Sequence, residues 1–395
     1  MDTRLQSSLV ALSLIGADGA LAVQPQPVDL GPIDFIPTAQ VYLGYDDNIE
    51  QAPAGEERSS TVTNLRATLR LRAQERRNVY DIAYLPEFFQ YWSYGNQNRF
   101  NNTLRFQSNT VFNSRSRLRM RASWSRLEDI QDDTNRRFDE SGNIRNNYNL
   151  TGIYRYGADS AKGQIEFQGG YRWNRYENNL TGGSNNRDRE YDSPQARGTF
   201  YWRVAPKTRA LFEFRYAHFD YLWSESTLNS QNFSYLVGAT WRATGKTEGT
   251  AKIGYEEKRY DDADKDNTST TAWDVGVTWR PSIRSVIRLR TQSTIDEGSS
   301  FEDSIGSARY VLTWNQDWRN RFSTDTIVSY RTQDYQGGFN NNRTDDTLTL
   351  GAGFRYAFRR WFDVGLDYRF KQQDSTSDAA KYDRNRVFLT FDLSL

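Results

Sequence analysis

From residue 38 to its last residue, this chain repeats one pattern, a segment of about ten or more residues with alternating apolar and polar side chains, followed by a turn. In "SRSRLRMRASW", residues 114–124, arginine occupies every second position from 115 to 121. The alternate positions 118, 120, 122 and 124 are all apolar. On a helix these arginines would surround the whole circumference, whereas on a strand they share one face. The chain is therefore predicted to be all-β, with strands that each have two unlike faces.

The alternation predicts about eighteen strands, an even number. They are expected at 38–46, 60–73, 78–92, 100–113, 116–128, 145–157, 162–176, 190–204, 208–222, 231–243, 247–260, 269–280, 284–295, 304–316, 320–333, 345–357, 360–373 and 383–395.

The connections between these segments alternate in length. Tight pieces such as "QERRN", "APKT" and "FRR" alternate with longer polar ones such as "ENNLTGGSNNRDRE" and "RYDDADKDNTS". A transmembrane up-and-down antiparallel β-barrel has short periplasmic turns, long outer loops and both chain ends on the periplasmic side. A soluble sandwich has no reason to alternate in this way. A propeller would need four short strands in each repeat of about forty residues, where this chain has one pair of long segments.

Composition agrees with a barrel that crosses a membrane with strands. With 37% hydrophobic and 26% charged residues, the chain is too polar for helical membrane spans. Its formal net charge of +1 gives no sign of nucleic-acid binding. The absence of cysteine excludes disulfides and thiolate metal sites, and suits an exported bacterial protein.

The N-terminus resembles a secretory signal. Arg4 precedes an apolar stretch at 9–15, and Ala20-Leu21-Ala22 forms a small-x-small cleavage site. The predicted organisation is a signal peptide at 1–22, an extended proline-rich periplasmic lead-in at 23–37 and an outer-membrane β-barrel at 38–395.

The apolar face of each strand is expected to contact outer-membrane lipid and lipopolysaccharide. Phe212, Phe214 and Tyr216 exemplify this face. Tryptophans are expected near both ends of the strands, as the two interfacial girdles of a membrane barrel require. Trp202, Trp241, Trp279, Trp314 and Trp361 lie beside short turns, and Trp92, Trp173, Trp223 and Trp273 lie toward long loops.

The opposite face would line a cationic lumen that guides anions. The predicted pore-lining, anion-guiding residues are Arg66, Arg70, Arg72, Arg105, Arg117, Arg119, Arg121, Arg172, Arg197, Arg203, Arg215, Arg242, Arg280, Arg288, Arg290, Arg309, Arg355 and Arg369. The acidic residues on this face are fewer: Asp81, Glu87, Glu166, Glu213, Glu256, Asp274, Asp325, Asp363, Asp367 and Asp392. About half of the basic residues are expected to pair with acids on neighbouring strands. The excess would favour anions in the pore.

Signs of enzymatic chemistry are weak. The chain has a single histidine, His218, which excludes a histidine-rich metal site. The aspartates at 261, 262, 264 and 266 lack the glycine and terminal glutamate of an EF-hand loop. We therefore predict a protein that is not an enzyme, with no catalytic residues, no cofactor and no metal site.

A family resemblance starts at "VYLGYDDNIEQAP". With Gly44, Tyr45, Asp46, Asp47 and Asn48 after a proline-rich lead-in, the chain resembles the beta-barrel porins often encoded with bacterial exopolysaccharide biosynthesis genes. The last strand, "RVFLTFDLSL", resembles the C-terminal insertion signal of outer-membrane proteins, with leucine in place of the usual phenylalanine. A more distant similarity is to the alginate-export porins, in strand number and arginine-rich lumen. The resemblance implies a Gram-negative outer-membrane protein that helps polysaccharide leave the cell.

The first functional hypothesis is accordingly an outer-membrane channel that passively conducts an anionic exopolysaccharide, supplied by periplasmic export machinery. The alternative is a general or anion-selective diffusion porin for small solutes. A structural or adhesive barrel with a plugged lumen, and an outer-membrane enzyme, are two further alternatives. None of these involves nucleic acid.

Overall fold

The computed structural model describes residues 26–129, 142–180, 186–242, 244–299, 301–339 and 341–394. The expected signal peptide at 1–22 lies outside these residues. Nearly all of the described chain is β-strand, with three short 3-10 helices in the connections. None of the helices in these ranges is long and apolar enough to cross a membrane.

The strands are β1 (Val28–Asp29), β2 (Ile33–Asp46), β3 (Ser60–Glu75), β4 (Asn78–Tyr91), β5 (Arg99–Val111), β6 (Ser116–Asp129), β7 (Asn143–Tyr156), β8 (Gly163–Tyr176), β9 (Tyr191–Ala205), β10 (Thr208–Tyr221), β11 (Ser230–Trp241), β12 (Thr247–Tyr260), β13 (Thr268–Ser282), β14 (Ser285–Ser299), β15 (Glu302–Asp317), β16 (Phe322–Gln336), β17 (Thr344–Arg359), β18 (Phe362–Ser375) and β19 (Tyr382–Ser394). The helices are η1 (Gly95–Gln97), η2 (Asn186–Arg189) and η3 (Asp378–Ala380).

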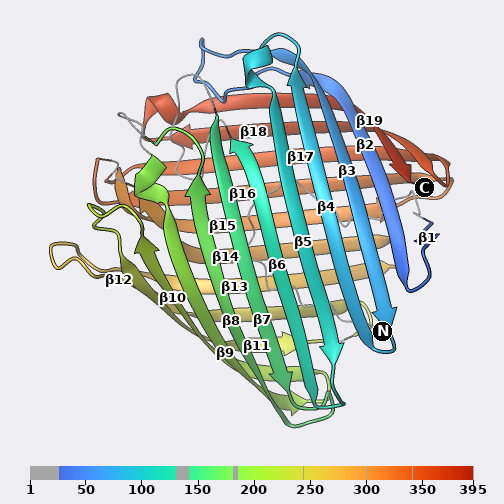
Figure 1. Cartoon of the computed structure of the whole chain (residues 1–395), viewed down its shortest axis with the longest axis vertical. Coiled ribbons are helices and arrows are strands. Elements are labelled where there is room, and N and C mark those ends of the chain that lie inside the picture. The colour runs from blue at the N-terminus through green and yellow to red at the C-terminus, as the bar shows by residue number, and fades with distance from the viewer. Residues whose placement is uncertain are drawn as a thin grey trace.

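Strands β2 to β19 form a closed antiparallel barrel of eighteen strands (Figure 1). Each strand pairs with the next along the chain, and β19 pairs back with β2, with Leu389 opposite Leu43. The short β1 pairs with β2 outside this ring. Among the described strands β2 to β19, closure leaves no unpaired strand edge, which is the condition for crossing a membrane with strands. The predicted up-and-down barrel is confirmed.

The strand boundaries differ from the sequence-based expectation in two informative places. β2 begins at Ile33, so residues 33–37 of the expected lead-in belong to the sheet. β14 continues to Ser299 and β15 starts at Glu302, where a longer loop was expected. Gly298 lets β14 and β15 approach closely here, because a Cβ at this position would lie only 2.2 Å from the Glu302 carbonyl oxygen.

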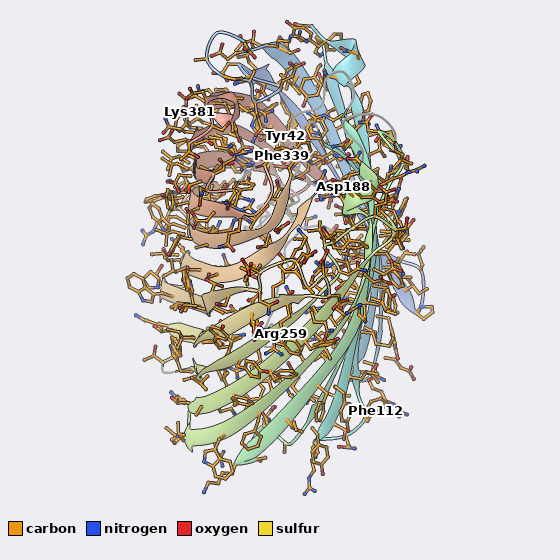
Figure 2. All side chains as sticks on the ribbon, turned by 90° about the vertical axis from the view of Figure 1, so that its left-hand side faces the viewer. Tyr42, Phe112, Asp188, Arg259, Phe339 and Lys381 are labelled. Carbon is orange, nitrogen blue, oxygen red and sulfur yellow. The ribbon has the colours of Figure 1, made fainter. Side chains whose placement is uncertain are left out.

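The two ends of the barrel differ as the alternating connections predict. The connections at 47–59, 92–98 and 376–381 and the described residues 177–180 and 186–190 lie at one end, and tight turns such as 76–77 and 206–207 lie at the other. Figure 1 shows β1 and the end of β19 on the side of the tight turns. In Figure 2, Lys381 lies toward this long-connection end and Phe112, in a tight turn, lies toward the opposite end. Because outer-membrane barrels have short periplasmic turns, this long-connection end is the outer one.

The outward face is apolar along the length of the strands. Val237 on β11 opposes Ile253 on β12, and their side chains are 56% and 59% exposed. Trp202 and Trp279 are likewise exposed beside the tight turns. Exposed apolar side chains in this number are stable only against hydrocarbon, so the outer surface of the barrel is the lipid-facing surface.

Candidate functional site

The inner face of the barrel carries the arginines that the sequence singles out. Leu65, Leu69 and Leu71 of β3 point outward and are exposed, which turns Arg66 and Arg70 toward the lumen. By the same parity, register places the following on the inner face: Arg66, Arg70, Arg72, Arg105, Arg117, Arg119, Arg121, Arg172, Arg197, Arg203, Arg215, Arg288, Arg290, Arg309, Arg355 and Arg369.

Two of the predicted residues lie at the rim rather than on the wall. Arg242 follows the end of β11 and belongs to the tight turn before β12. Arg280, near the end of β13, pairs at 2.8 Å with Glu248, and both side chains are substantially exposed. Charges at this rim contribute to the periplasmic entrance and not to the middle of the lumen.

Positive charges face each other directly across neighbouring strands of the inner wall. The opposed pairs are Arg117 with Arg155, Arg197 with Arg215, Arg203 with Arg209, Arg309 with Arg331, Arg369 with Arg386, and Lys371 with Arg384. Like charges in register destabilise a sheet unless acids or solution anions compensate them.

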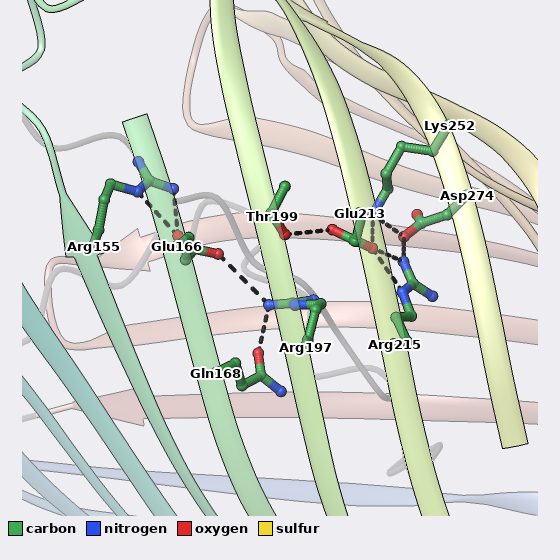
Figure 3. Close-up of polar contacts among 9 residues, drawn as sticks. All are labelled: Arg155, Glu166, Gln168, Arg197, Thr199, Glu213, Arg215, Lys252 and Asp274. Carbon is green, nitrogen blue, oxygen red and sulfur yellow. Dashed lines mark hydrogen bonds and ion pairs between the residues drawn. The ribbon is translucent and has the colours of Figure 1, made fainter. Parts of the chain in front are cut away.

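One group of these charges is compensated by acids between β7 and β13, through two neighbouring sets of contacts around Glu166 and Glu213 (Figure 3). Glu166 accepts from Arg155 at 2.6 Å and lies 3.7 Å from Arg197. Two strands further along, Glu213 accepts from Arg215 at 2.6 Å and from Lys252 at 3.1 Å.

Asp274 belongs to the network around Glu213. It lies 2.7 Å from Lys252 and 2.9 Å from Arg215, so that two acids and two bases alternate across β10, β12 and β13. Such networks hold the side chains of the wall in fixed positions, and their acids neutralise much of the positive charge there.

A second group of compensated charges lies around the closure of the barrel. Arg66 pairs with Glu87, and Arg70 pairs with Asp81 at 2.5 Å. Arg355 lies 2.8 Å from Asp367 and 3.1 Å from Asp392.

Other cations of the inner wall lack such a partner. Within the described residues, the side chains of Arg121, Arg369 and Arg386 make neither a hydrogen bond nor an ion pair. Arg121 belongs to the row of three lumen-facing arginines on β6. These side chains leave a net positive charge facing the lumen.

At the periplasmic end, Arg117 of β6 reaches the tight turn between β7 and β8. It lies 2.9 Å from Asp159, in the connection between β7 and β8. The hydrogen bond from Arg117 holds the pKa of the Asp159 carboxyl below its usual range. The carboxylate therefore stays charged at neutral pH and offsets part of the charge of the arginine row.

The first long connection, 47–59, folds into the mouth of the barrel. Ile49 is fully buried and packs against Val62, Phe89 and Tyr91, whose side chains point into the lumen. An apolar residue from an outer loop thus caps an apolar patch on the inner wall. Sequence reasoning did not find this inward fold.

Residues of the "GYDDN" stretch anchor this loop to the last strand. Arg384 donates to Asp46 at 2.9 Å, and Asn385 donates its backbone N–H to Asp47 at 2.7 Å. Asn48 donates its side-chain amide to the carbonyl oxygen of Asp383 at 2.9 Å.

Gly44 begins the same stretch and lies where β2 meets β19. A Cβ at this position would approach the Val387 carbonyl oxygen to 2.0 Å. The stretch on which the family resemblance rests therefore lies at the β2–β19 pair that closes the barrel, and it continues into the inward-folded loop.

Several lumen cations escaped the sequence-based prediction. They include Arg99, Arg145, Arg155, Arg209, Arg384 and Arg386. The alternation of side chains in the sequence could have identified them. Arg155, for example, lies between Tyr154 and Tyr156, which both face outward and are exposed. Across the described ranges, no group of three or more side chains has the composition of a metal site.

A closed barrel with a lipid-facing exterior and a charged interior defines an integral β-barrel protein of the bacterial outer membrane. Over residues 24–394 the sequence matches the family described as "Putative beta-barrel porin 2". The chain belongs to this beta-barrel porin family.

Solved structures with a similar fold share little sequence with this chain. The FrpB iron transporter from Neisseria meningitidis is 8% identical, with 93% of this chain and 83% of that chain covered and a TM-score of 0.49. OccK2 (OpdF) of Pseudomonas aeruginosa is 11% identical, with 92% and 98% covered and a TM-score of 0.47. OccAB3 of Acinetobacter baumannii is 10% identical, with 91% and 98% covered and a TM-score of 0.46. No curated protein matches the sequence significantly.

Proposed function

We propose that the protein is an outer-membrane channel, not an enzyme, whose cationic lumen conducts anions by passive diffusion. The observation that carries this proposal is the register of the inner wall, which sets arginine opposite arginine on several strand pairs. A folded chain tolerates such pairs where counterions reach them from solution.

The size of the barrel supports a conducting role. Barrels of about sixteen to eighteen strands leave an aqueous channel that side chains alone do not fill. In such a channel a positive wall of low dielectric constant concentrates anions and repels cations. The ion-pair networks around Glu166 and Glu213 hold the wall rigid, and the surplus arginines set its sign.

Small anionic solutes are the cargo that the inward-folded loop favours. Ile49 is completely buried against the inner wall, so this segment narrows the outer mouth. A narrowed mouth admits a small carboxylate or phosphate more easily than a hydrated polymer. An anion-selective diffusion porin is therefore our first proposal for the function.

An anionic exopolysaccharide is the second candidate cargo. Arg117, Arg119 and Arg121 form a row along the lumen side of β6. In an extended strand, residues two apart lie about 6.6 Å from each other, so the row offers regularly spaced cations to a chain of repeated carboxylates. In this role the protein would receive its cargo from periplasmic export machinery.

Planar-bilayer recording tests the proposal directly. With a KCl gradient across the bilayer, the purified channel should show a zero-current potential of the sign given by chloride permeation. Oligouronates of increasing length, added to one side, then separate the two cargoes. Passage of long oligomers supports polymer export, and a cutoff at one or two sugars supports a diffusion porin. A cation-selective or insulating barrel would refute the proposal.

A further inference from the structure

We propose that Arg369, Lys371 and Arg386 form a discrete binding site for one oxyanion group, a carboxylate or a phosphate, of a solute that passes through the lumen. This inference rests on the proposed function, because the site is reached only through the lumen. It goes further by giving the channel a specific binding step at one place on its wall.

The three cations belong to two adjacent strands and share the inner face. Arg369 on β18 lies directly opposite Arg386 on β19, and Lys371 lies opposite Arg384 one step closer to the outer end. Opposed residues of an antiparallel pair have Cα atoms about 4.5–5.5 Å apart. Two guanidinium groups and one ammonium group thus start from a very small area of the wall.

The acids around this group are already engaged elsewhere. Asp46 accepts hydrogen bonds from Arg384, at 2.9 Å from its Nε. Asp367 is held by Arg355 at 2.8 Å, and Asp345 by Arg343 at 2.6 Å. Arg369 and Arg386 have no ion pair within the part of the chain that the structure describes, so their countercharge must come from a solute.

Neutral polar groups border the same place. Lys371 donates to the side-chain oxygen of Gln51 at 2.8 Å, which brings the inward-folded loop to the edge of the site. The ring of Tyr382 lies with its centroid 5.1 Å from the Lys371 ammonium.

Tyr382 gives an independent sign of a missing partner. Its side chain is buried, yet within the described residues its hydroxyl group has no hydrogen-bond partner. Buried hydroxyl groups are nearly always satisfied, so an unpaired one on the ring that lies next to the Lys371 ammonium fits a position that a ligand oxygen completes.

The chemistry of the three cations selects an oxyanion. A guanidinium group donates two parallel N–H bonds to a carboxylate or phosphate, and an ammonium group adds a strong point charge. Chloride offers a single centre and does not use the forked geometry. The site should therefore hold oxyanions more tightly than chloride and slow their passage.

Block of the chloride current measures this binding. Sodium phosphate and sodium succinate are titrated separately against the single-channel KCl current of the full-length protein. The native channel should show saturable block by at least one of the two probes, and the probe with the lower half-blocking concentration identifies the preferred group. Arg369→Gln/Arg386→Gln should raise this concentration at least roughly tenfold.

Three controls make the outcome decisive. Arg386→Lys keeps the charge and removes the forked donor, so it should give an intermediate half-blocking concentration. Arg126→Gln/Arg259→Gln removes two cations from the outward face and should leave the block at its native value. A heat-modifiability shift on gels establishes that each variant has folded.

Two results would overturn the inference. Non-saturable block of the native channel by both probes, or an unchanged half-blocking concentration in Arg369→Gln/Arg386→Gln, removes the site. In either case a native zero-current potential of chloride sign would leave the proposed anion channel intact. A native channel without anion preference would instead remove the proposed function itself.

Discussion

Arg384 of β19 and Asp46 of β2 are 338 residues apart in the chain, and they form a buried ion pair with an Nε–Oδ1 distance of 2.9 Å. The pair joins β19, the last strand of the barrel, to β2, the first strand of the barrel, beside the inward-folded loop. It therefore links closure of the barrel to the shape of its outer mouth.

Asp46→Asn should destabilise the barrel markedly. Removing one partner of a buried ion pair leaves the other charge uncompensated, at a cost of roughly 3–5 kcal/mol. The temperature at which the folded band disappears on semi-native gels should fall. Asp383→Asn removes the same charge from an exposed position on β19, next to Arg384, and should have little effect. Equal melting temperatures for the two variants would contradict the assigned role of the pair.

Ile49→Ser should open the mouth of the channel. The substitution removes the apolar contact that holds the loop against Val62, Phe89 and Tyr91. Single-channel conductance is expected to rise, with larger fluctuations of the open current as the loop moves. Glu57→Ala changes an exposed residue of the same loop and serves as the control. A conductance equal to that of the native channel would show that the loop does not narrow the pore.

Glu213→Gln should weaken the network on β10, β12 and β13. Arg215 and Lys252 would then share the single carboxylate of Asp274. We expect the free energy of unfolding in detergent to fall by roughly 3 kcal/mol and anion selectivity to increase. Urea titration followed by tryptophan fluorescence measures the first effect, and the zero-current potential measures the second. A stable variant with reduced anion preference would contradict this view of the wall.

Ile253→Arg tests the assignment of the lipid-facing surface. An arginine on the lipid face near the bilayer midplane costs roughly 2–4 kcal/mol. Thr250→Arg places the same side chain on the lumen face of the same strand, where water solvates it. Unfolding from lipid vesicles should show a large loss of stability for the first variant and a small loss for the second. The reverse order would mean that the two faces have been exchanged.

The sequence was sufficient to predict the barrel because its determinants are local. Alternation of apolar and polar residues marks each strand, and the parity that exposes Leu65 to lipid also turns Arg66 inward. The same argument predicts that Arg155 and Arg386 face the lumen. For Arg155 the signal is the two flanking tyrosines, which face outward.

Contacts between distant segments could not be predicted in the same way. The burial of Ile49 depends on side chains of β3 and β4, and no periodicity signals a loop that turns inward. The sharing of Asp274 between Arg215 and Lys252 depends on register across β10, β12 and β13. Which arginines are compensated therefore became visible only with the strands in place.

The most direct test of the central claim replaces Arg117, Arg119 and Arg121 with serine and measures the zero-current potential in a KCl gradient. The matched control is Arg126→Ser/Arg259→Ser, which removes positive charge from the outward face. If lumen charge governs permeation, the triple variant loses much of its preference for chloride and the control keeps it. An unchanged potential in the triple variant would contradict the cationic-lumen account.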